Sequence, residues 1–123
     1  MATRYTRDHE WIRLEGDVAL IGISDHAQEQ LGDIVFVELP DVGKKPAKGE
    51  EVAVVESVKA ASEVFAPVAG EVVAVNLTLS DSPGAVNEAA EGAGWIVKLK
   101  PDNAADLDAL MDETAYKAFL ETL

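Results

Sequence analysis

Residues 32–39 of the chain are GDIVFVEL, and residues 70–77 are a second version of the same motif, GEVVAVNL. The two stretches lie 38 residues apart, share four identical positions of eight and differ conservatively at two more. Each is followed by another apolar run, at residues 52–55 and 95–99. Repetition of a strand-rich unit predicts two similar half-sheets that close on each other. We therefore expect a mainly β fold with a quasi-twofold sandwich or flattened barrel over residues 32–99.

The same offset aligns two turn-like segments. Lys48-Gly49-Glu50 falls on Val86-Asn87-Glu88. Glycine and asparagine best tolerate a left-handed backbone. We therefore expect Gly49 and Asn87 to occupy equivalent turns.

The rest of the chain adds a hairpin and helices. Apolar runs at residues 10–14 and 18–23 flank a turn at Glu15-Gly16-Asp17. Residues 24–32 predict a short helix that Asp25 caps and Gly32 ends. After Pro101 we expect a C-terminal helical segment, residues 101–123, whose apolar face covers the sheet. Its apolar positions are spaced by three and four residues: Leu107, Leu110, Met111, Tyr116, Phe119, Leu120 and Leu123.

Length and composition limit the chemistry. The 123 residues, 48% of them apolar, suit one domain, residues 1–123, with a core of its own. The absence of cysteine excludes disulfides, a catalytic thiol, a cysteine zinc site and an iron–sulfur cluster. The two histidines, His9 and His26, have no acidic triad close in sequence, so we expect no metal site and structural roles for both.

Charge and hydropathy limit the partners. Ten basic and 23 acidic residues give a net charge of −13, which disfavours nucleic acid and favours partners with basic surface, unless the charge serves only solubility. The longest apolar runs, such as residues 18–23, are too short to span a bilayer. Residues 1–4 are polar and lack the core of a signal peptide. We expect a cytoplasmic protein without membrane association.

Lys59 is isolated among acidic residues. It is the only basic residue between Gly49 and Val97, a region that holds eight acidic residues. Residues 51–57 and 62–66 have the pattern of strands, and residues 58–61 connect them. We therefore expect a rigid hairpin that presents Lys59 at its tip, between Glu56 and Glu63.

The segment around this lysine resembles the lipoyl-attachment segment of the H proteins of the glycine cleavage system. The segment is ESVKAASEVFAPVAGEVV, residues 56–73. Further motifs fall where that family has them: HEW at 9–11, GISDHAQ at 22–28, LGDIVFVELP at 31–40, DSP at 81–83 and GWIVKL at 94–99. The resemblance covers nearly the whole chain. It implies a lipoyl-domain-like barrel-sandwich hybrid, a single carrier domain with the lysine on a hairpin.

The resemblance implies a carrier rather than an enzyme. (R)-Lipoate would be joined to Lys59 as an amide by a lipoate-attaching enzyme. A pyridoxal-phosphate glycine decarboxylase would load an aminomethyl group onto the lipoyl arm, and an aminomethyltransferase would pass the one-carbon unit to tetrahydrofolate. Dihydrolipoyl dehydrogenase, with FAD and NAD, would reoxidise the arm. We expect the carrier to be a monomer.

The resemblance also suggests roles for further residues. Glu56, three residues before the lysine, and Gly70, eleven after it, match the signature that the modifying enzyme recognises. The carboxylate that pairs with the aminomethyl nitrogen would be Glu10, with Asp8 as a weaker candidate. Gln30 and Glu63 are further candidates for contact with the arm. Some family members have histidine where this chain has Gln30, which cannot titrate.

Three other carrier classes and one structural class stay open. A lipoyl relay that delivers lipoate to other enzymes would use the same surface. A lipoyl domain of a 2-oxoacid dehydrogenase usually has aspartate just before the lysine, and a biotin carrier has methionines on both sides, whereas Val58 and Ala60 flank Lys59 here. A structural or adaptor domain would leave the isolated lysine unexplained.

Overall fold

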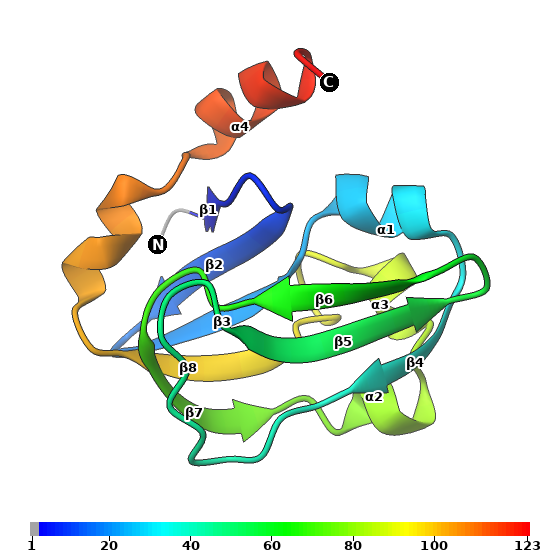
Figure 1. Cartoon of the computed structure of the whole chain (residues 1–123), viewed down its shortest axis with the longest axis horizontal. Helices are drawn as coiled ribbons and strands as arrows, with labels where there is room; N and C mark the ends of the chain where they lie inside the picture. The colour runs from blue at the N-terminus through cyan, green and yellow to red at the C-terminus, as the bar shows by residue number, and fades with distance from the viewer. Residues whose placement is uncertain (1–2) are drawn as a thin grey trace.

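A computed structural model describes residues 3–123, so the first two residues of the polar start lie outside the described part. Eight strands form two antiparallel sheets that stack on each other, with the smaller sheet in front in Figure 1. The larger sheet has the order β1 (Thr3–Tyr5), β2 (Glu10–Glu15), β3 (Val18–Ile23), β8 (Val97–Pro101) and β7 (Gly70–Val75). The smaller has the order β4 (Ile34–Glu38), β5 (Glu51–Ser57) and β6 (Ala61–Phe65). The expected sandwich is confirmed, with two open and unequal sheets.

The core fills the space between the sheets. Strand alternation turns Ile12 and Ile21 of the larger sheet inward, where they join Val55 and Val64 of the smaller one, all at most 1% exposed. The opposite face of the larger sheet carries a second apolar cluster, which includes Trp11. The two clusters explain why β2 and β3 are buried on both faces.

Five helical segments connect or cover the strands. They are α1 (Asp25–Leu31), α2 (Thr78–Asp81), α3 (Ala85–Glu88), the 3-10 helix η1 (Ala104–Ala109) and α4 (Glu113–Leu120). The N-cap of α1 is Ser24, whose hydroxyl accepts from the Ala27 N–H at 3.2 Å, so the assignment of the cap to Asp25 was wrong. Gly32 ends α1 with φ of 78°, as expected for a glycine stop. None of the helices in residues 3–123 has the length and hydropathy needed to cross a membrane.

The C-terminal segment packs in two places, with η1 against the core between the sheets and α4 against the outer face of the larger sheet. Leu107 of η1 and Tyr116 of α4 are buried, whereas Leu123 is 69% exposed. Tyr116 stacks on Tyr5, with ring centroids 4.3 Å apart. In Figure 1 α4 lies at the N-terminal edge of the larger sheet, next to β1. The predicted packing face is therefore confirmed at six of its seven apolar positions, and Leu123 is the exception.

The two halves of the internal repeat have register shifts at equivalent positions. The ladder between β4 and β5 shifts register between Ile34 and Phe36, and that between β7 and β8 shifts between Val72 and Ala74. The repeat offset of 38 residues maps the first pair onto the second. Identical bulge positions in the two halves support a quasi-twofold relation between them.

The expectation of equivalent turns at Gly49 and Asn87 was wrong. Gly49 lies in a turn with φ of 86°, but Asn87 lies in α3. The Asn87 side chain accepts from the Ile34 N–H at 2.8 Å and donates to the Gly32 carbonyl at 2.9 Å. Asn87 therefore fastens the end of α1 and the start of β4, a tertiary role that replaces the turn.

Candidate functional site

The hairpin of β5 and β6 presents Lys59 at its tip. The Ser57 N–H donates to the Ala60 carbonyl at 2.8 Å, which closes a turn over Val58 and Lys59. The Lys59 side chain is exposed. In Figure 1 the hairpin extends to the end of the smaller sheet, away from both chain termini. The structure thus provides an accessible primary amine on rigid strands, as the sequence predicted.

The tip rests on the connection between α1 and β4. The Val58 N–H donates to the Asp33 carbonyl at 3.1 Å. A Cβ placed on Gly32 would lie 3.5 Å from Cε of Lys59, so the stem of the lysine passes over this glycine. Gln30, on the last turn of α1, is exposed two residues before. These contacts bring Gln30 into the neighbourhood of Lys59.

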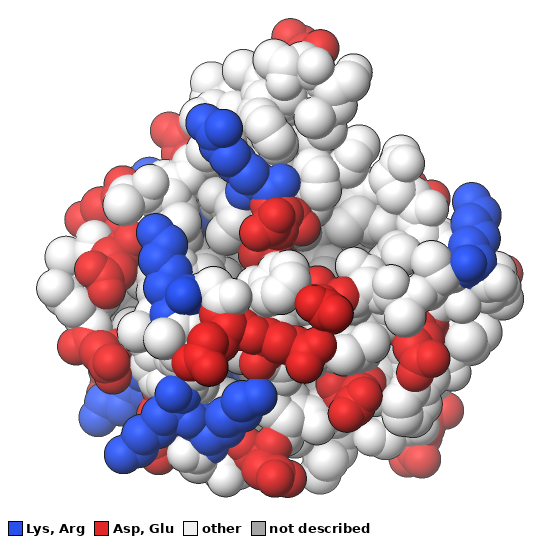
Figure 2. Space-filling view, viewed as in Figure 1, with Lys and Arg blue, Asp and Glu red and all other residues white. Residues whose placement is uncertain are grey.

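Acidic side chains share the outer face of the smaller sheet. Val54 is paired with Glu38 on one side and Glu63 on the other, and Glu56 is paired with Phe36. Cross-strand partners project from the same face, so these glutamates lie together on the side away from the core. Figure 2 shows acidic residues gathered over this sheet and basic ones around its margin. The two ion pairs recorded for residues 3–123 do not include Lys59.

Glu56 and Gly70 have different surroundings. Glu56 is half-buried on β5, three residues from the lysine. Gly70 begins β7, where an added Cβ would lie only 2.4 Å from the Lys100 carbonyl oxygen. Close approach of β7 and β8 therefore requires glycine at this position. Recognition of either residue by the modifying enzyme stays a prediction.

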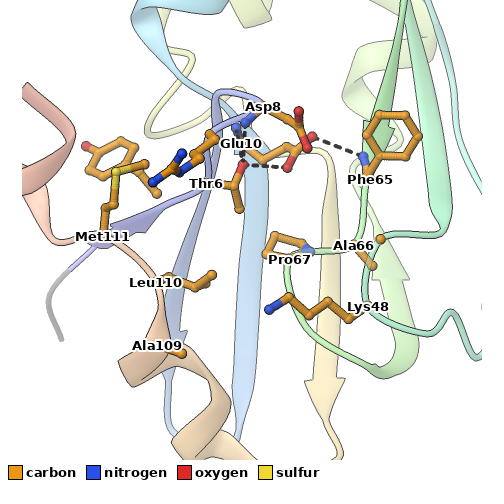
Figure 3. A pocket seen from close by; sticks show the side chains of 13 residues that line it. Thr6, Asp8, Glu10, Lys48, Phe65, Ala66, Pro67, Ala109, Leu110 and Met111 are labelled. Carbon is orange, nitrogen blue, oxygen red and sulfur yellow. Dashed lines mark hydrogen bonds between the residues drawn. The ribbon is translucent and has the colours of Figure 1, made fainter. Parts of the chain in front are cut away.

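Glu10 is a buried carboxyl group at the far end of β6 from the lysine. Its side chain accepts hydrogen bonds from the Thr6 hydroxyl at 2.6 Å and from the Phe65 N–H at 3.2 Å, and Glu10 is 2% exposed (Figure 3). Burial raises the pKa of Glu10 to about 7, and the charge of the neighbouring Asp8 adds to the increase. A carboxyl group with this pKa changes charge near neutral pH.

A cavity of about 310 Å³, the Glu10 cavity, opens beside this carboxyl group. Lys48 reaches into it from the wall opposite Glu10, and Leu110 lies on a third side (Figure 3). Its lining consists of Tyr5, Thr6, Arg7, Asp8, Glu10, Lys48, Gly49, Phe65, Ala66, Pro67, Ala109, Leu110 and Met111. The lining combines apolar side chains with one buried carboxyl group, which can accept from a cation, and with the cationic side chains of Arg7 and Lys48.

The edge of β6 connects the lysine with this cavity. β6 is the outer strand of its sheet, so alternate N–H groups point away from β5. The Phe65 N–H is one of these, and Glu10 accepts it. Ala61 and Phe65 are separated by about 13 Å at ~3.3 Å per residue. Glu63 lies between these two residues and is exposed, and Asp8 is exposed on the loop before β2. Both acidic side chains therefore lie on the surface, whereas Glu10 is buried.

Tyr116 connects the two segments that flank this edge, and nothing in the sequence indicated it. Its hydroxyl lies 2.7 Å from Oγ of Ser24, at the start of α1, and 2.8 Å from Nδ1 of His9, in the loop before Glu10. His9 has a left-handed φ of 68°, unusual for a residue other than glycine. Burial, together with the neighbouring His26, lowers the pKa of His9. The three- and four-residue spacing of apolar residues had predicted only that Tyr116 packs against the sheet.

The comparison with known protein families decides the class. A family model described as glycine cleavage H-protein matches residues 3–123. The chain belongs to this family. It is 66% identical over 122 residues to the glycine cleavage system H protein of Xanthobacter autotrophicus, with 99% of this chain and 98% of the relative covered. The H protein of Caulobacter vibrioides is 58% identical over 120 residues, with 98% and 99% covered.

A solved H protein has the same fold. The crystal structure of a glycine cleavage system H protein from Mycobacterium marinum matches with a TM-score of 0.87 and 37% identity, over 99% of this chain and 98% of the other. Membership makes the chain a carrier component of the glycine cleavage system and not itself a catalyst, in a family that bears lipoate. The match along the whole chain decides against the biotin-carrier and 2-oxoacid-dehydrogenase alternatives.

Proposed function

We propose that Lys59 carries (R)-lipoate as an amide and that the chain shuttles aminomethyl groups. It receives them from the pyridoxal-phosphate glycine decarboxylase and delivers them to the tetrahydrofolate-dependent aminomethyltransferase. Dihydrolipoyl dehydrogenase, with FAD and NAD, then reoxidises the arm, and the whole cycle runs in the cytoplasm. The observation that carries the proposal is one exposed lysine at the tip of the β5–β6 hairpin, in a chain that matches the H-protein family from residue 3 to 123.

The residues at the tip fit the lipoyl group. Lys59 lies in neither of the recorded ion pairs of residues 3–123, and its side chain is exposed, so an attaching enzyme has access to its amine. Amide formation removes the positive charge of the lysine. When bound, the lipoyl group supplies a disulfide that accepts the aminomethyl group as it is reduced. The tether keeps the cargo at a high effective concentration for each partner.

Glu10 is the residue that would hold the cargo end of the arm. An aminomethyl group carries an ammonium, and a buried carboxylate is a strong acceptor for it. The Glu10 cavity offers apolar surface beside this carboxyl group, against which the arm could pack and shield the labile group from part of the solvent. An approaching cation favours the charged form of Glu10 and so lowers its pKa from the value near 7. Asp8, Glu63 and Gln30 would contact the arm from the margin.

Reconstitution tests this function. The chain, lipoylated on Lys59, is incubated with purified glycine decarboxylase and glycine, and its intact mass is followed with the release of carbon dioxide. We expect glycine-dependent release and an aminomethyl increment on the peptide that contains Lys59, with neither in Lys59→Arg. A lipoylated chain that stays unloaded, while an established H protein is loaded in parallel, would favour the lipoyl relay instead.

A further inference from the structure

One side chain, that of Ser57, makes three hydrogen bonds within the turn that presents Lys59. Oγ of Ser57 accepts hydrogen bonds from the Lys59 N–H at 3.2 Å and from the Ala60 N–H at 3.1 Å. The same hydroxyl donates to the Ala60 carbonyl at 3.1 Å. These contacts come in addition to the backbone hydrogen bond between Ser57 and Ala60. Ser57 therefore binds the backbone on both sides of the tip at once.

Few other features of the turn fix its shape. Val58, Lys59 and Ala60 include no glycine, proline, asparagine or aspartate, the residues that usually determine a tight turn. All three are exposed, and Val58 is 68% exposed, so packing restrains them little. A serine hydroxyl that bonds to backbone groups two and three residues ahead takes over the function of a turn residue.

The second restraint on the tip comes from the backbone. The Val58 N–H donates to the Asp33 carbonyl at 3.1 Å, which fixes the start of the turn against the α1–β4 connection. Its partners are main-chain groups, so side-chain substitution leaves them in place. Ser57 alone holds the part of the turn that contains the N–H of Lys59 itself.

We propose that Ser57 is a positioning residue for the modification of Lys59. Its hydroxyl sets the tip in one conformation, and the lipoate-attaching enzyme meets the lysine already presented. An enzyme that binds a tip with several conformations must first order it, which weakens binding and leaves the chemical step unchanged. The inference rests on the proposed function, because it requires that Lys59 is lipoylated.

The test compares four full-length chains: the wild type, Ser57→Ala, Ser57→Thr and Ser62→Ala. Ser62 is a matched control because it lies on the same hairpin, half-buried on β6 and paired with Val55. Lipoylation by a lipoate-attaching enzyme, with lipoate and ATP, is followed by intact mass at several concentrations of each chain. Loss of the three hydrogen bonds of this one exposed hydroxyl predicts a fall of about 3- to 10-fold in kcat/KM for Ser57→Ala, with kcat unchanged. Ser57→Thr and Ser62→Ala should stay within about twofold of the wild type.

Amide exchange gives a second readout. We expect the Lys59 and Ala60 N–H groups of Ser57→Ala to exchange faster than those of the wild type, by about the same 3- to 10-fold. Wild-type kcat/KM in Ser57→Ala, failure of Ser57→Thr to restore it, or an equal loss in Ser62→Ala would overturn the inference. If Ser57→Ala is modified normally and Lys59→Arg is not modified, the inference about Ser57 fails and the proposed function stands. A wild-type chain that is never modified would instead remove the proposed function.

Discussion

At the scale of single residues, Glu10 combines deep burial with hydrogen bonds from uncharged donors. Its partners are the Thr6 hydroxyl and the Phe65 N–H, which stabilise a carboxylate less than a cation would. This carboxyl group is therefore only partly ionised near neutral pH. Under the proposed function, a loaded arm would bring a positive charge to Glu10 and favour its charged form, whereas an empty arm would not.

This arrangement predicts a dependence of stability on pH. The pKa of Glu10 is about 7 in the folded chain against 4.5 in the unfolded one, so the folded state binds the proton more tightly. The stabilisation by this proton is complete below pH 4.5 and is lost as the pH rises through 7. Glu10→Gln keeps an acceptor for Phe65 without the charge. Urea unfolding measures the free energy of unfolding of both proteins at pH 5 and pH 8. The difference, Glu10→Gln minus wild type, should be larger at pH 8 than at pH 5, by about 3 kcal/mol at most. Parallel curves for the two proteins would contradict this.

The same residue predicts the lifetime of the cargo. Glu10→Ala removes a charge-assisted hydrogen bond to the aminomethyl nitrogen and should speed loss of the group from the loaded chain about tenfold. The rate is measured by intact mass after glycine decarboxylase is removed. Glu51→Gln, on the exposed end of β5, is the control and should keep the wild-type rate. An unchanged rate in Glu10→Ala would remove Glu10 from the site.

At the scale of elements, α4 connects the segments on either side of the β6 edge through the hydroxyl of Tyr116. That hydroxyl contacts Ser24 and His9, and the Ser24 N–H also donates to the His9 carbonyl at 2.8 Å. The loop with Asp8 and Glu10 is thereby fixed to the start of α1, whose other end lies beside Lys59. A helix distant from the lysine in sequence thus fixes the position of the loop before Glu10 relative to α1.

Removal of this hydroxyl should lower the stability of the fold. Tyr116→Phe removes the contact of Tyr116 with Nδ1 of His9 and one of the two contacts of the buried Ser24 hydroxyl, which costs about 1–2 kcal/mol and lowers Tm by roughly 3–8 °C. Calorimetry measures the change. Thr114→Ala, exposed on the same helix, should leave Tm within about 1 °C, since surface substitutions have small effects. An equal Tm for Tyr116→Phe and the wild type would show that the contact does not hold α4.

Local sequence patterns predicted the strands and helices. The features that these patterns missed depend on residues that are far apart in the sequence. The hairpin around Lys59 follows from strand alternation and the charge pattern, which need only neighbouring residues. Asn87 was misassigned because its partners, Ile34 and Gly32, lie more than 50 residues away. The burial of Glu10 likewise depends on Phe65, 55 residues later. Sequence periodicity carries no information on such pairs, and it also gave no sign of the Tyr116 contact.

At the scale of the whole molecule, charge is distributed unevenly. The net charge is −13, and acidic residues gather over the smaller sheet, on the face that ends at the hairpin tip (Figure 2). Lipoylation of Lys59 would remove the single positive charge between Gly49 and Val97. The modified tip would then extend from the acidic face without a positive charge of its own, which would favour partners with basic surface.

This distribution predicts a strong salt dependence of partner encounters. The KM of glycine decarboxylase for the lipoylated chain should rise about tenfold between roughly 0.05 and 0.3 M salt, while kcat changes little, because salt screens the attraction between exposed charges. Substitution of Glu38 and Glu63, which flank Val54 on the outer face of the smaller sheet, by glutamine should flatten this dependence. A KM that is constant across the salt range would show that charge serves solubility and not docking.

Intact-mass analysis shows whether Lys59 is the lipoyl-bearing residue. The wild type and Lys59→Arg are produced with a lipoate-attaching enzyme and lipoate, and the modified peptide is located by fragmentation. We expect one lipoyl increment in the wild type, on the peptide that contains Lys59, and none in Lys59→Arg. An unmodified wild type, or an increment that survives in Lys59→Arg on another lysine such as Lys48, would contradict this assignment.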